Sequence, residues 1–230
     1  MDSPSPFISA LGHVLWIGGS PCAGKTSISD RLAQTYQLQV YHFDRTEREH
    51  IARRIAQGGA RLTAFLSQSM DERWLKRSPE VMAQSVISFW TERFHQVLED
   101  LLALPQAPGI IAEGPGLFPE CVFPCLSHPH QAIWLVPTDA FCTAIRQHRH
   151  AAGIDGFQQT SDPERAVRQL IERDHLLARY VKQQTEALHL PLYEVDGNRS
   201  LDEMTRLVEQ HFAPLLPPSK KRAGEGKNDL

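Results

Sequence analysis

The sequence predicts an α/β protein in which a five-stranded parallel sheet carries helices on both faces. Short apolar segments alternate along the chain with longer segments of helical periodicity, as expected when a crossover helix follows each strand. A glycine-rich loop separates the first of these strands from the first helix. Acidic residues follow the second and third strands, at the sheet edge where parallel sheets bind their ligands. The expected strands are residues 13–18, 38–44, 109–112, 131–136 and 191–195.

The glycine-rich loop fits the phosphate-binding pattern G-x-x-x-x-G-K-[ST], known as the P-loop. It follows an apolar run at 14–17 and precedes an amphipathic segment at 25–36. In such a loop, backbone N–H groups surround phosphate oxygens and the helix N-terminus adds partial positive charge. A chance match in a glycine-rich turn is the alternative, and the flanking strand and helix argue against it. The residues expected to bind phosphate are Gly19, Ser20, Pro21, Cys22, Ala23, Gly24, Lys25, Thr26 and Ser27.

The segments between the later strands are expected to be mostly helical. A charged stretch over 45–57 ends at a pair of glycines, and residues 60–77 suggest helix that is interrupted around 67–70. A Ser-Pro pair at 78–79 starts a helix of about 25 residues that prolines end. Residues 1–11, rich in Ser and Pro, are expected to be an irregular leader. Capping residues predict three more helices, over 139–150, 162–188 and 201–212.

Asp44 and Glu113 are the candidate catalytic acids, because each follows a predicted strand end. Strand ends of a parallel sheet lie together, so both should lie near the P-loop. Asp44 is the first choice of base, with capping of the next helix as the alternative. Glu113 could instead hold a Mg²⁺-bound water or act as the base, or it could make only a strand-end hydrogen bond. Thr26 is the other expected metal ligand, through its hydroxyl.

Composition narrows the class of protein. The chain has 230 residues, of which 41% are hydrophobic, and a formal net charge of −3. One domain over 1–213 with a disordered tail over 214–230 is expected. The charge gives no reason to expect nucleic acid as a partner. No apolar run approaches the length of a membrane span, and the N-terminus lacks signal-peptide features, so a cytoplasmic protein without membrane contact is expected. Oligomeric state cannot be read from the sequence.

The cysteines are expected to be free thiols. Cys121 and Cys125, with His128 and His130 close behind, look superficially like a metal cluster. Prolines interrupt this segment, and its spacing matches no common zinc module. Small buried side chains are therefore the favoured interpretation, and a zinc site is the alternative.

The chain resembles the group of P-loop small-molecule and nucleoside-monophosphate kinases, which includes shikimate, gluconate, chloramphenicol and adenylate kinases. The resemblance covers most of residues 12–213 and is most specific at the P-loop. The segments 165–168, 173–174, 180–181 and 192–197 are similar to the arginine-bearing helix, last strand and adenine-side loop of these kinases. The resemblance implies the strand order 2-3-1-4-5, with ATP and Mg²⁺ as cofactors. It also implies that a helical insertion at about 45–104 contributes the acceptor site.

Two departures from the family pattern bear on the acceptor. Nucleotide kinases such as adenylate kinase carry an Asp-Gly-Phe-Pro-Arg-like segment after strand three, whereas residues 113–119 here contain no arginine. Their Gly-Asp-x-x-Arg-like segment after strand two is replaced by residues 42–45, His-Phe-Asp-Arg. An acid ending strand two is more like the shikimate, gluconate or chloramphenicol kinases. A small molecule phosphorylated at a hydroxyl is therefore favoured over a nucleoside monophosphate, which remains the runner-up.

Arginines are expected to meet the charge that develops on a transferred phosphoryl group. The candidates flank a mobile-looking loop at 153–161: Arg146 and Arg149 end one helix, and Arg165, Arg168 and Arg173 begin the next, with Arg146, Arg149 and Arg165 preferred. With that loop they would form a lid over about 146–173. Ordinary surface arginines are the alternative for each of them. A nucleotide-dependent switch without an acceptor is the rival function, although the guanine-specific Asn-Lys-x-Asp segment is absent after strand four.

Overall fold

The computed structural model describes residues 6–218, and its sheet has the predicted topology. Five parallel strands hydrogen-bond in the order β2-β3-β1-β4-β5. The strands are β1 (Val14–Gly19), β2 (Gln39–His42), β3 (Ile110–Glu113), β4 (Ala132–Pro137) and β5 (Leu192–Val195). Both the fold class and the strand order are thus confirmed.

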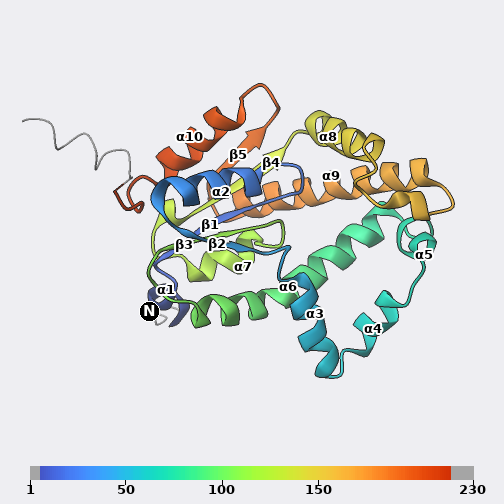
Figure 1. Ribbon diagram of the computed structural model, residues 1–230, viewed down its shortest axis with the longest axis horizontal. Coiled ribbons are helices and arrows are strands. Elements are labelled where there is room, and N and C mark those ends of the chain that lie inside the picture. The colour runs from blue at the N-terminus through green and yellow to red at the C-terminus, as the bar shows by residue number, and fades with distance from the viewer. Residues whose placement is uncertain (1–5, 219–230) are drawn as a thin grey trace, which may run out of the picture.

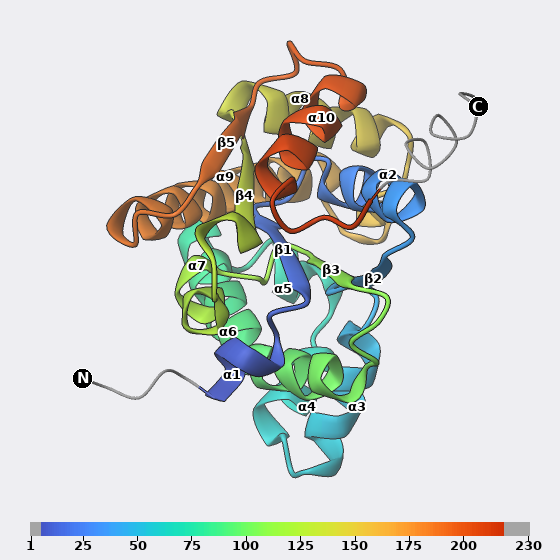
Figure 2. The same ribbon diagram turned by 90° about the vertical axis from the view of Figure 1, so that its left-hand side faces the viewer.

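Side-chain alternation along the central strand explains why both faces of the sheet carry helices. All six residues of β1 are buried. Val14 and Trp16 point into one apolar cluster, whereas Leu15 and Ile17 point into another on the opposite face. Helices α2 and α10 cover the second cluster, and α6, α7 and α9 cover the first. Figure 2 shows α2 and α10 on one side of the strands, with α6 and α7 on the other.

The long helices begin at the predicted caps. Ser78, Thr138, Asp162 and Ser200 each accept a hydrogen bond from a backbone N–H in the first turn of the helix that follows. The helices are α1 (Pro6–Ala10), α2 (Lys25–Tyr36), α3 (Glu47–Ala56), α4 (Ala60–Leu66), α5 (Met70–Trp74), α6 (Pro79–Ala103), α7 (Pro119–Val122), α8 (Asp139–Ala151), α9 (Pro163–Ala187) and α10 (Leu201–Phe212). Three single 3-10 turns complete the list: η1 (Phe123–Cys125), η2 (Pro129–Gln131) and η3 (Phe157–Gln159). Figure 1 shows α3, α4 and α5 in an arc beyond the sheet, beside α6.

Two segments differ from expectation, and a third agrees with it. Residues 6–10 form α1 rather than irregular leader, and the adjoining Leu11 is fully buried in the core. The interruption expected within 60–77 is confirmed: α4 ends at Leu66, and Ser69 and Glu72 form a reciprocal capping box that starts α5. The predicted tail starts too early, since Leu216 packs against the α2–α10 cluster; its remainder, 219–230, lies outside the described residues.

The loop expected to be mobile is held against α5. Phe157 of η3 is buried, and its ring lies 5.0 Å from that of Trp74. The backbone N–H of Ser161 donates to Asp71 Oδ1 over 2.8 Å. In the part of the chain that the structure describes, no helix is both long and apolar enough to cross a membrane.

Candidate active site

The loop between β1 and α2 has a backbone that favours glycine and leaves the helix start open. Gly24 caps α2 with φ of 75°, and Cys22 also has a positive φ of 69°. Gly19 has φ of 127°, and a Cβ there would lie 1.9 Å from the Leu135 carbonyl oxygen. Gly24 and the first residues after Lys25 are exposed. An anion can therefore approach the N–H groups at the N-terminus of α2.

Lys25 lies buried within this loop. Its ammonium donates to the Ser20 carbonyl oxygen over 2.6 Å. Burial lowers the pKa of Lys25, and the negative charges of Glu113 and Asp44 oppose that shift. The two predicted acids are thus close enough to act on this lysine through their charge.

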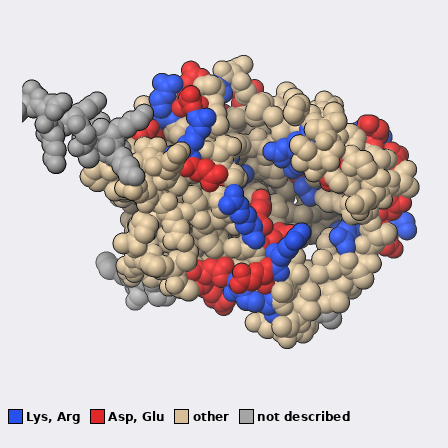
Figure 3. Space-filling model, in the orientation of Figure 1, with Lys and Arg blue, Asp and Glu red and all other residues tan. Residues whose placement is uncertain are grey.

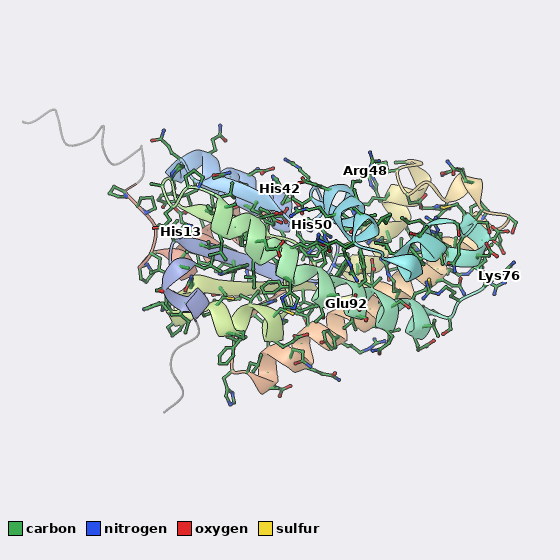
Figure 4. All side chains as sticks on the ribbon, turned by 90° about the horizontal axis from the view of Figure 1, so that it is seen from below. His13, His42, Arg48, His50, Lys76 and Glu92 are labelled. Atoms are coloured by element: carbon green, nitrogen blue, oxygen red, sulfur yellow. The ribbon has the colours of Figure 1, made fainter. Side chains whose placement is uncertain are left out.

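Glu113 joins the end of β3 to the start of α2. The Thr26 hydroxyl donates to both Glu113 carboxylate oxygens, over 3.1 and 3.2 Å. His42 Nδ1 lies 2.8 Å from Glu113 Oε1, because His42 and Glu113 are paired in the β2–β3 register. Figure 4 shows His42 where β2 leads toward α3. The two predicted metal ligands are therefore in contact, and His42 is a neighbour that the sequence did not single out.

Asp44 lies two residues beyond β2 with a carboxylate that has no hydrogen-bond or ion-pair partner among residues 6–218. Its capping alternative is not supported, because Thr46 is the N-cap of α3 and no side chain caps that helix. The side chain is exposed to solvent, yet the surrounding protein raises the pKa of Asp44 through desolvation, against the attraction of Lys25. A carboxylate with a raised pKa and no partner is suited to take up a proton.

A fully buried arginine on α6 fixes the segment that carries Asp44. Arg93 donates to the Phe43 carbonyl oxygen and, over 3.0 Å, to Glu47 Oε2. Its guanidinium also lies 3.8 Å from the centre of the Phe43 ring and donates to His50 Nδ1 over 2.9 Å. Sequence reasoning missed Arg93, because nothing local marks a residue on the 79–103 helix as a partner of the 43–50 segment.

A buried carboxylate on α9 gathers two arginines beside the P-loop. Asp174 accepts from Arg146 Nε over 2.7 Å and from Arg173 Nη2 over 2.7 Å. Burial acts to lower the pKa of Arg146, but the charges of Asp174 and Cys22 outweigh it and raise that pKa. The predicted Arg146 is thus close to the P-loop through Cys22. Asp174 was not predicted as a site residue.

Two further predicted arginines, Arg149 and Arg165, lie apart from this pair. Arg149 is exposed at the end of α8, within the range at which its charge lowers the pKa of Cys22. Arg165 is exposed in the first turn of α9 and donates to the Leu75 carbonyl oxygen over 3.2 Å. It therefore links α9 to the end of α5 in this structure.

The cysteines form two pairs: Cys22 of the P-loop lies beside Cys142 of α8, whereas Cys121 and Cys125 lie at the core cluster on the α6–α9 face of the sheet. A hydrogen bond from Cys142 lowers the pKa of Cys22 to about 7, whereas the same contact raises that of Cys142. With Asp174 their ligand atoms lie within 4.8 Å of one another, a grouping that the sequence did not predict. Burial raises the pKa of Cys121 to about 12 and that of Cys125 to about 11, so both stay protonated. No metal-type group among the described residues includes Cys121, Cys125, His128 and His130.

A cavity of about 820 Å³ lies between α3, α4, α5 and α6, with Arg173 of α9 also on its wall. Glu47 is both a wall residue and the first residue of α3, and its N–H donates to the Asp44 carbonyl oxygen over 3.4 Å. Figure 3 shows a hollow in this part of the surface, with Lys and Arg side chains around it. Trp74 and Trp90 line the cavity and Arg54 does as well, whereas the exposed Arg48 is not part of the wall.

Comparison with known proteins adds little about the reaction. No protein-family model matches the chain. No curated protein shows significant similarity to it. Among solved structures, a shikimate kinase from Acinetobacter baumannii in complex with shikimate matches with a TM-score of 0.43 and 15% identity, over 87% of this chain and 93% of that one. An uncharacterized protein from Eubacterium ventriosum ATCC 27560 matches with a TM-score of 0.42 and 12% identity, over 87% and 98% of the two chains. Similarity this low does not indicate an activity, so an activity has to be inferred from the residues of the site.

Proposed function

We propose that this protein is an ATP- and Mg²⁺-dependent kinase that phosphorylates a hydroxyl group of a small molecule. The observation that carries the proposal is the contact between Thr26 of the P-loop and Glu113 at the end of β3. The unpartnered carboxylate of Asp44 lies close enough to interact with the charges of Lys25 and Glu113. A phosphate-binding loop, a metal-binding pair and a free base are the three parts that phosphoryl transfer requires.

The donor set fits magnesium and a polyphosphate. Mg²⁺ prefers hard oxygen ligands, and the Thr26 hydroxyl and Glu113 carboxylate supply them at one place. The open N-terminus of α2 and the ammonium of Lys25 suit phosphate oxygens. When bound, ATP would supply the phosphoryl group and Mg²⁺ would balance its charge.

Each protein group then has a defined task. Lys25 would exchange its contact with the Ser20 carbonyl for a phosphate oxygen, which explains why a buried ammonium needs so little protein pairing. Asp44 would accept the proton of the acceptor hydroxyl, and His42 would orient Glu113. Arg146 would stabilise charge on the transferred group, with Arg149 and Arg165 contributing once the 146–173 segment closes.

The proposal is tested by measuring ADP formation with a panel of hydroxylated small molecules. The wild type should show turnover that depends on one class of acceptor, and Lys25→Ala should abolish it. Asp44→Asn should lower turnover by about 100-fold or more, the contribution typical of a general base, while ATP still binds. Turnover that persists in Lys25→Ala would refute the mechanism.

The same assay separates the alternatives. Slow ATP hydrolysis that no acceptor stimulates would indicate a nucleotide-dependent switch instead of a kinase. Stimulation by nucleoside monophosphates alone would indicate a nucleotide kinase. Undiminished turnover in Asp44→Asn would transfer the base role to Glu113.

A further inference from the structure

The cavity between α3 and α6 carries more positive than negative charge on a wall that is otherwise mostly apolar. Four arginines line it, Arg54, Arg73, Arg77 and Arg173, against two glutamates, Glu47 and Glu92. Glu92 pairs with Arg54, and Glu47 pairs with Arg93, which is outside the wall. Arg73 and Arg77 have no carboxylate partner among the described residues. Two cations on one wall of the cavity are therefore left uncompensated.

These two arginines converge on one exposed aromatic ring. The guanidinium of Arg73 lies 5.3 Å from the centre of the Phe65 ring, and that of Arg77 lies 5.7 Å from it. Their hydrogen bonds go to neutral oxygens: Arg73 donates to the Leu66 carbonyl, and Arg77 donates to the Ser85 hydroxyl and, over 3.5 Å, to the Val81 carbonyl. Arg73 Nε is buried without any partner. Donors that are held in place but only partly satisfied are suited to an incoming anion.

The rest of the wall is suited to an apolar body. Phe65 and Leu66 are each 38% exposed although both are large and apolar. Trp74, Phe89 and Trp90 line the same space. A volume of about 820 Å³ is near the upper end of the roughly 300–1,000 Å³ typical of small-molecule sites. The occupant is therefore expected to be larger than a single small hydroxy acid.

We propose that this cavity binds the acceptor, and that the acceptor is an anionic amphipathic molecule. Its carboxylate, sulfate or phosphate would bind Arg73 and Arg77, and its ring or alkyl body would pack against Trp74 and Phe89. Its hydroxyl would lie toward the Glu47 end of the cavity, nearest Asp44. The inference about the acceptor rests on the proposed kinase function, whereas anion binding by the cavity can be measured without turnover.

The test uses two fluorescent probes that share aromatic rings and differ in charge. 8-Anilinonaphthalene-1-sulfonate carries a sulfonate, and N-phenyl-1-naphthylamine has the same rings without it. The double variant Arg73→Gln/Arg77→Gln should weaken binding of the sulfonate by at least about tenfold, the effect of losing one charge-assisted hydrogen bond. Binding of the neutral probe should change by less than about twofold, because its ring contacts are kept.

Controls separate this cavity from other basic surfaces. Arg206→Gln alters a smaller depression on α10 and should leave sulfonate binding unchanged. Salt should weaken sulfonate binding to the wild type more than binding of the neutral probe, which tests the inference even if the double variant does not fold. Sulfonate binding that is insensitive to both salt and the double substitution would overturn the proposal, as would an equal loss for both probes.

Failure of this inference and failure of the proposed kinase function give different experimental results. Lys25→Ala removes the proposed phosphoryl transfer and should leave sulfonate binding intact. If no acceptor is ever turned over but the probe results hold, the kinase proposal fails and the anion site stands. If turnover is found only with neutral acceptors and Arg73→Gln/Arg77→Gln does not affect it, the inference about the acceptor fails and the kinase proposal stands.

Discussion

Replacing Asp174 by Asn tests whether one buried carboxylate holds α8 and α9 together beside the P-loop. The Asp174 side chain is fully buried and pairs with Arg146 and Arg173, whose side chains are 15% and 12% exposed. Asparagine keeps the size of the side chain but removes its charge, so two largely buried guanidinium groups lose their counter-ion. Breaking a buried ion pair by removing one partner costs about 3–5 kcal/mol. We expect the lower end of that range, because the Asn oxygen can still accept one hydrogen bond.

The measurement is urea-induced unfolding of both proteins, followed by circular dichroism. Asp174→Asn should lower the free energy of unfolding by about 3 kcal/mol without changing the denaturant slope. Asp202→Asn is the control, because Asp202 pairs with Arg31 on the surface and should contribute no more than about 1 kcal/mol. In a double-mutant cycle with Arg146→Met, the two losses should not add. A loss below about 1 kcal/mol for Asp174→Asn would refute the assigned role of the carboxylate.

Three other predictions concern single groups. Because desolvation raises the pKa of Asp44, turnover should fall as the pH drops through that raised pKa. At neutral pH the ionised Asp44 carboxylate opposes folding, so Asp44→Asn should have the same melting temperature as the wild type or a higher one. A lower melting temperature of Asp44→Asn would contradict this. Alkylation of Cys22 by iodoacetamide should show a midpoint at about pH 7, and Cys142→Ala should move that midpoint upward; unchanged rates in the variant would contradict the thiol pairing. Arg93→Leu should lower the free energy of unfolding by about 3–5 kcal/mol, because Glu47 and the Phe43 carbonyl lose a buried donor. A free energy of unfolding within about 1 kcal/mol of the wild-type value would contradict this prediction.

The elements that the sequence predicted correctly are those whose ends depend on neighbouring residues. The caps at Ser78, Thr138 and Ser200 each bond to an N–H three residues away, so a short window of sequence contains the whole interaction. The interruption expected around 67–70 is a further example, because Ser69 and Glu72 are close in the sequence and form the capping box that starts α5.

The residues of the candidate site were predictable from the sequence only where their position at the end of a strand places them next to the P-loop. Thr26 and Glu113 are in contact because a P-loop and the end of an adjacent parallel strand always meet at the same edge. Asp174 and Arg93 could not be found this way. Each lies in the interior of a 25-residue helix, and its partners come from segments about 30 to 50 residues away, so only tertiary packing brings them together.

The short helix α5 contacts both the cavity and the 153–161 loop. Asp71 and Trp74 hold the 153–161 loop through the Ser161 N–H and the Phe157 ring, and Arg73 and Trp74 also line the cavity. A ligand in the cavity that displaces this helix also changes its contacts with the loop. By thermodynamic linkage, a ligand that binds the cavity and favours closure of the loop must bind the closed form more tightly than the open form by the same factor. The five residues of α5 would thereby couple occupancy of the cavity to the position of the 153–161 loop.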